Sequence, residues 1–155
     1  MRFPTIAARD LENTEYTLPD DLPASWRIVL MPFKRQQQIV VSAWTDVLEP
    51  LVSAHPDLTV WEVPTLSRAW APARGYIDGG MRAGIPDPEV RRHTLTAYTP
   101  LHEVAEAFGL ADFADVQVFL LDAAGEIVWR SCGEPDAEKA AALADALVAA
   151  GGMPA

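Results

Sequence analysis

Cysteine is almost absent from this sequence, which contains only Cys132 among its 155 residues. One cysteine cannot form an internal disulfide, and it leaves no CxxC pair and no thiolate-rich zinc motif. The three histidines, His55, His93 and His102, share no ligand spacing with one another, so no metal and no other cofactor is predicted. The lack of a disulfide framework is typical of a reducing compartment.

Long apolar runs and positive charge are also scarce. No run approaches the ~20 apolar residues that a membrane helix needs, so membrane insertion is not expected. Residues 1–16 carry charges early and have no apolar signal core, so we expect a cytoplasmic protein. The net charge of −10 repels phosphate backbones, so general nucleic-acid binding is not expected either.

The few basic residues are unevenly distributed. Five of the twelve Lys and Arg residues fall between positions 68 and 92; they are Arg68, Arg74, Arg82, Arg91 and Arg92. One interpretation is that they neutralise nearby acidic residues, such as Asp78, Asp87 and Glu89. The other is that they form a binding surface for a partner.

Aromatic residues and methionine accompany these arginines. Trp70, Tyr76 and Met81 lie in the same segment, and aromatic, Met and Arg side chains are enriched in protein interfaces. The alternative is that Trp70 and Met81 cover the domain's own core. Because this segment interrupts an otherwise regular pattern, we favour a partner surface.

Residues 28–63 have the pattern of a strand–helix–strand unit. Residues 28–33 form an apolar run typical of a strand buried on both faces, and Pro32 should end or bend it. From Gln37 the apolar residues recur at helical spacing, and Pro50 should kink that helix or end it nearby. The expected core face consists of Val40, Ala43, Trp44, Val47, Leu48, Leu51 and Val52. A second strand is expected over residues 58–63.

The rest of the chain predicts an insert, a strand, a helix, a hairpin and a final helix. Residues 66–81 favour a helix interrupted by Pro72 and Gly75, followed by a broken loop that begins at Gly79-Gly80. A strand is expected over 93–98, a helix over 100–108 ending at Gly109, and a hairpin over 116–130 turning at 122–125. The last helix covers 137–150, with Ala140, Leu143, Ala144, Leu147 and Val148 on its core face.

This order predicts one α/β domain over residues 1–155, a mixed sheet flanked by helices with an insert at about 66–92. It resembles the thioredoxin fold. The run IVLMPFKRQQQIVVSAW resembles the strand, active-site loop and helix of peroxiredoxin-type chains. The hairpin FLLDAAGEIVWRSCG, with Trp129 and Cys132, is most similar to the cysteine-poor thioredoxin-like assembly factors of the mitochondrial ATP synthase, as is the insert.

The sequence departs from the redox members of this superfamily at two places. By resemblance, their cysteines would fall near Gln38 and Val41, and neither residue can form a thiolate. Their cis-proline would precede the hairpin strand, where this chain has residues 114–117, ADVQ. Both halves of the redox site are therefore missing together, which implies that the redox function has been lost.

Two functions follow as hypotheses. The first is a redox-inactive binding or assembly module for a protein partner, without a cofactor and of undetermined oligomeric state. Its surface would combine the loop 33–38 with the insert 68–92; the binding residues expected are Lys34, Arg35, Gln36, Gln37, Gln38, Arg74 and Arg82. The second is a single-thiol oxidoreductase or peroxidase using Cys132, which requires this thiol to be exposed. A buried, structural Cys132 is the simpler expectation.

The segment from Lys34 to Gln38 also leaves room for a third hypothesis. A helix start with free backbone N–H groups and two adjacent cations favours a bound anion, including a glutathione-like ligand. The alternative is a solvated helix start with no ligand.

Overall fold

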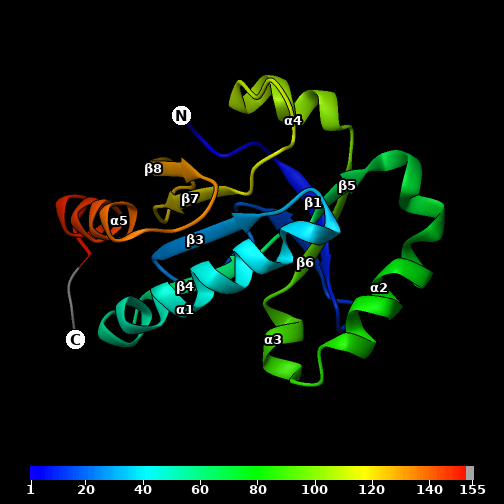
Figure 1. Ribbon diagram of the computed structural model, residues 1–155, viewed down its shortest axis with the longest axis horizontal. Helices are drawn as coiled ribbons and strands as arrows, with labels where there is room; N and C mark the ends of the chain where they lie inside the picture. Colours follow the sequence, from blue (N-terminus) through cyan, green and yellow to red (C-terminus); the bar gives the residue numbers. More distant parts are fainter. Residues whose placement is uncertain (153–155) are drawn as a thin grey trace.

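The computed structural model describes residues 1–152 and forms an α/β fold of two four-stranded sheets covered by helices (Figure 1). The strands are β1 (Ile6–Asp10), β2 (Glu15–Leu18), β3 (Trp26–Met31), β4 (Leu58–Glu62), β5 (Thr65–Ser67), β6 (Leu95–Thr99), β7 (Gln117–Leu121) and β8 (Ile127–Cys132). The α-helices are α1 (Gln38–Ala54), α2 (Arg74–Gly84), α3 (Pro88–Arg92), α4 (Leu101–Phe108) and α5 (Ala137–Ala149). Two 3₁₀ turns, η1 (Arg35–Gln37) and η2 (Arg68–Ala73), precede α1 and α2. None of these helices combines the length and the apolar composition that a bilayer span requires.

The two sheets are joined by one bent strand. One sheet has the order β4-β3-β7-β8 and the other β2-β1-β6-β5. At the bend, Val63 N donates to Leu30 O at 2.7 Å and Thr65 N donates to Pro32 O at 2.9 Å. Ala97 N donates to Pro64 O at 2.9 Å on the other side. The segments β4 and β5 are therefore two halves of one strand, paired first with β3 and then with β6.

The core lies on both faces of β3 and β7. Residues Ile28 to Met31 are fully buried, as predicted for a strand covered on both sides. Helices α1 and α5 cover one face, where Trp44 and Leu48 pack with Leu143 and Leu147. The opposite face carries a second cluster that includes Phe3, Phe108 and Phe119, whose rings contact one another.

Several predicted boundaries are confirmed. Strand β3 ends at Met31, directly before Pro32. Gly109 ends α4 in the left-handed region, at φ +67°, and Gly125 adopts φ +85° in the hairpin turn. Helix α1 passes Pro50 and ends four residues later, at Ala54.

Other predictions are wrong. Helix α2 continues through Gly79 and Gly80 to Gly84, where a broken loop was expected, because polar contacts with β6 hold it in place. The short strand β5 lies where the insert helix was expected to begin. Two residues assigned to core faces are exposed, Val47 at 39% and Val148 at 60%, because each lies just beyond the stripe that its helix buries.

Candidate functional site

The loop between β3 and α1 is fixed by a buried amide. Gln37 Oε1 accepts hydrogen bonds from Phe33 N at 2.7 Å and from Lys34 N at 3.2 Å. Its Nε2 donates to Phe113 O at 2.9 Å, across to the segment that precedes β7. The rings of Phe33 and Phe113 pack beside this link at 4.8 Å. One glutamine thus holds together the two segments that the sequence analysis assigned to the lost redox site.

The five predicted residues of this loop, Lys34 to Gln38, differ in exposure and in contacts. Lys34, Arg35 and Gln36 are exposed, so their side chains are available to a ligand. Gln37 is buried and positions the loop, as described above. Gln38 begins α1 and hydrogen-bonds to the carboxyl group of Glu62.

The carboxyl group of Glu62 lies next to Gln38, the first residue of α1. Glu62 is the last residue of β4, and Thr94 pairs with it as an isolated parallel bridge. Burial raises the pKa of Glu62 to about 7, and its hydrogen bond with Gln38 opposes this rise. The carboxyl group therefore changes charge within the physiological range.

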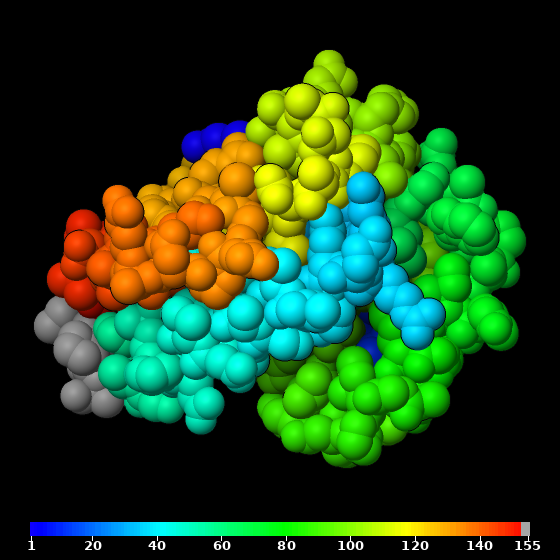
Figure 2. All heavy atoms as spheres, in the orientation of Figure 1, coloured from blue at the N-terminus to red at the C-terminus, as the bar shows by residue number. Residues whose placement is uncertain are grey.

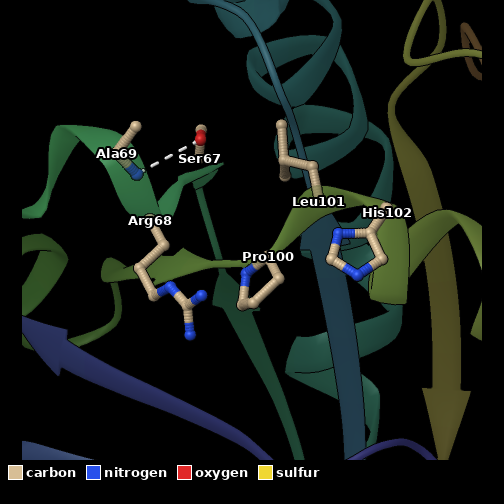
Figure 3. Close-up of a pocket in the computed structure, with 6 residues that line it drawn as sticks. All are labelled: Ser67, Arg68, Ala69, Pro100, Leu101 and His102. Atoms are coloured by element: carbon tan, nitrogen blue, oxygen red, sulfur yellow. Dashed lines mark hydrogen bonds between the residues drawn. The ribbon is translucent and has the colours of Figure 1, made fainter.

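A surface cavity of about 490 Å³ lies at the carboxyl ends of β5 and β6. Its walls come from Ser67, Arg68 and Ala69 after β5 and from Pro100, Leu101 and His102 after β6. In Figure 3 the side chains of Arg68 and His102 flank the ring of Pro100. Ser67 Oγ accepts from Ala69 N and so caps η2. These walls carry the positive charge of Arg68 and no carboxylate.

The two insert arginines predicted to bind a ligand are engaged in internal contacts. Arg74 lies 3.6 Å from the carboxylate of Asp78, donates to Thr96 O at 2.9 Å, and stacks on the Tyr98 ring. Thr96 and Tyr98 each donate a hydroxyl hydrogen bond to Asp78 at 2.8 Å. Burial and then Asp78 raise the pKa of Tyr98. No residue of α2 is buried, so this polar network is what holds the helix against β6.

Arg82, Arg91 and Arg92 neutralise acids, as one interpretation of the sequence expected, whereas Arg68 does not. Arg82 and Arg91 both approach the carboxylate of Glu12, and Arg92 pairs with Glu89. The binding assignment of Arg74 and Arg82 stays a prediction, since both side chains would have to leave these partners to reach a ligand.

Cys132 is exposed, so the expectation of a buried thiol is wrong. It is the last residue of β8, an edge strand paired only with β7, which leaves its side chain open to solvent. Together with Arg130, Gln117 and Asp115 it lines a cavity of about 330 Å³. Lys139 Nζ donates to Cys132 O at 2.7 Å and to Glu134 O at 2.8 Å, so this ammonium is directed at carbonyl oxygens.

Sequence reasoning missed two parts of this region. Glu62 gave no signal, because a glutamate at the end of a five-residue strand is ordinary and its burial follows from the folded structure. The Asp78–Tyr98 hydrogen bond joins residues 20 positions apart. It could not be predicted, because the sequence did not predict that α2 continues to Gly84 and packs on β6. Within residues 1–152, no group of three or more His, Cys, Asp or Glu side chains is placed to hold a metal ion.

Comparison with known proteins gives matches of structure only. No family model matches the chain, and no curated protein matches it. A putative electron transfer protein from Aquifex aeolicus aligns with a TM-score of 0.66 at 15% identity, covering 94% of each chain. The exposed lipoprotein thioredoxin Etrx1 of Streptococcus pneumoniae aligns with a TM-score of 0.57 at 15% identity, covering 95% of this chain and 97% of the other.

A third match is the copper-bound Sco1 of yeast, with a TM-score of 0.55 and 16% identity over 95% of this chain and 90% of that one. These likenesses show a thioredoxin-like fold; they do not single out the peroxiredoxin type or the ATP synthase assembly factors that the sequence resembled. At such identities they establish architecture and leave the activity open. With its single cysteine and no CxxC pair, the chain is a protein of thioredoxin-like fold.

Proposed function

We propose that this chain is a thioredoxin-fold binding module without dithiol chemistry, which engages a protein partner at the loop following β3. The observation that supports this most directly is the position of Gln37. Its amide makes two hydrogen bonds within the loop and one to Phe113 O, directly beside the positions where the resemblance places the cysteines of the redox members. Lys34, Arg35 and Gln36 remain exposed around it and form the contact surface.

A reductase assay tests the absence of dithiol chemistry. Dithiothreitol-driven reduction of insulin should proceed no faster with the wild-type chain than in a protein-free blank. Cys132→Ser should behave identically. An acceleration by the wild type that disappears in Cys132→Ser would contradict the proposal and assign the chain to the thiol enzymes.

Site-directed photo-crosslinking tests the binding role. A benzoylphenylalanine at Gln36, which is exposed beside the loop, should give a discrete adduct in the cells that express the chain. The same group at Asp145, exposed on α5, is the matched control. Identical adduct patterns at the two positions would show that the loop has no selective partner.

The exposure of Cys132 favours one second candidate, a single-thiol exchange protein. Its thiolate would attack a substrate disulfide, form a mixed disulfide and release one thiolate, and a small external thiol would then resolve the adduct. The rate of alkylation of native Cys132 against pH tests this function. A half-maximal rate well below pH ~8.5 supports it, and a rate that follows an ordinary free thiol opposes it.

A further inference from the structure

Three basic side chains in residues 1–152 have no internal partner. Nine of the twelve Lys and Arg residues contact a carboxylate, a backbone carbonyl or an aromatic ring in this structure; they are Arg2, Arg9, Arg27, Arg74, Arg82, Arg91, Arg92, Arg130 and Lys139. The remaining three are Lys34, Arg35 and Arg68, and all three are exposed. In a chain with a net charge of −10, unpaired cations are not explained by a shortage of acidic residues.

These three cations follow the carboxyl ends of neighbouring strands. Lys34 and Arg35 follow β3, and Arg68 follows β5, the half-strand that lies beside Pro32. The next parallel strand, β6, pairs with β5 at Ser67 and Thr99 and leads to His102. Because parallel neighbours lie ~4.8 Å apart, the carboxyl ends of these strands span roughly 10 Å. In Figure 2 the pale-blue atoms after β3 lie between the yellow-green atoms of α4 and the green insert.

We propose that this edge, formed by Lys34, Arg35, Arg68 and His102, binds an acidic segment of the partner protein, with several Asp or Glu side chains in succession. The inference rests on the proposed binding function and specifies the chemistry of the partner. The cavity between Arg68 and His102 has no carboxylate in its wall and accepts one acidic side chain. Lys34 and Arg35 then contact neighbouring acidic groups of the same segment.

Two features favour an extended protein segment over a single small anion. The cations follow different strands, so they are spread over roughly 10 Å. Alternate side chains of an extended peptide are ~7 Å apart, so one extended segment can contact more than one of these cations. Trp70 lies two residues beyond Arg68 and is 58% exposed, which offers an apolar contact that no inorganic anion uses. The acidic remainder of the surface repels such a segment elsewhere, so binding is restricted to this edge.

The probe is a fluorescein-labelled peptide of ten glutamates, and its binding to the 155-residue chain is followed by fluorescence anisotropy at low salt. Wild type should bind this peptide and should not bind a peptide of ten glutamines. The double variant Arg35→Glu/Arg68→Glu should weaken binding at least tenfold. The matched control is Arg2→Glu/Arg92→Glu, which reverses the same amount of charge at two exposed arginines elsewhere. The neutral pair Arg35→Gln/Arg68→Gln should give an intermediate loss, and circular dichroism checks that each variant is folded.

Each other result overturns the inference. No binding by wild type, or an equal loss in the control, shows that the edge is not an acidic-segment site. Complete displacement by millimolar inorganic phosphate points to a small-anion site. The wild type is also mixed with phosphatidylserine vesicles in the absence of the peptide. Binding to these vesicles that is lost in Arg35→Glu/Arg68→Glu would identify the edge as a membrane-binding surface. If the peptide fails while the crosslink at Gln36 persists and insulin reduction stays at the blank rate, the binding module stands with a different partner chemistry.

Discussion

Replacement of Glu62 by glutamine should stabilise the protein at pH 8 and have little effect at pH 4.5. In the folded chain the pKa of Glu62 is raised by burial to about 7, whereas in the unfolded chain this group has its ordinary value of 4.5. The native state therefore holds a proton that the unfolded state releases between these two values. The stability that this proton provides is fully present below about pH 4.5 and is lost as the pH rises through 7.

The size of the effect follows from the difference between the two pKa values. Subtracting 4.5 from 7 gives 2.5 pH units, and each unit corresponds to ~1.4 kcal/mol, so the upper bound is about 3.5 kcal/mol. Glu62 is half-buried, so solvent screening reduces this, and we expect about 1–3 kcal/mol. Glutamine keeps the shape and the hydrogen bond to Gln38 and carries no charge.

The assay is urea unfolding of both proteins at pH 4.5, 6, 7 and 8. The quantity of interest is the free energy of unfolding of Glu62→Gln minus that of wild type, because other titrating groups cancel in this difference. It should increase up to pH 7 and then level off. Glu49→Gln, an exposed glutamate on α1, controls for the removal of one surface charge. A difference that is flat across this range would refute the raised pKa of Glu62.

Three further substitutions test contacts that hold the site in place. Gln37→Ala leaves the backbone N–H groups of Phe33 and Lys34 without their acceptor and should lower the free energy of unfolding by about 2–3 kcal/mol in urea titration; an unchanged midpoint would show that the loop is held by other contacts. Tyr98→Phe removes a hydrogen bond to Asp78, so amide hydrogen exchange in α2 should accelerate severalfold while β3 and β7 stay protected; uniform acceleration would contradict a local role. The guanidinium of Arg27, buried by the fold, donates to the carbonyls of residues 19, 22 and 122, so Arg27→Met should cost on the order of 3 kcal/mol in thermal unfolding; a cost below ~1 kcal/mol would show that water replaces it.

The sequence predicted the elements whose signal is local. The strand ending at Pro32, the turn at Gly125 and the helix ending at Gly109 each depend on the conformational limits of one residue, and all three are confirmed. The change from a continuous apolar run to helical spacing and back was sufficient to predict the strand–helix–strand unit. The fold class followed from the order of these elements.

What could not be predicted depends on contacts between distant segments. Helix α2 contains four glycines, which lowers its intrinsic preference, and it forms because Arg74 and Asp78 bind β6. Strand β5 is three residues long and is defined by its pairing with β6. Residues Lys34 to Gln38 lie at the start of a helix, as predicted. That Gln37 is buried while Lys34 and Arg35 are exposed could not be predicted, because it depends on the contact between Gln37 and Phe113.

The amide of Gln37 also determines how this loop responds to its surroundings. A loop held by a dithiol has two covalent states, and its shape and affinity change when the pair is oxidised. A carboxamide undergoes no such change, so the loop keeps one conformation under reducing and oxidising conditions alike. A complex formed here would therefore dissociate through dilution, salt or a competing segment, and glutathione or peroxide levels would not control its lifetime.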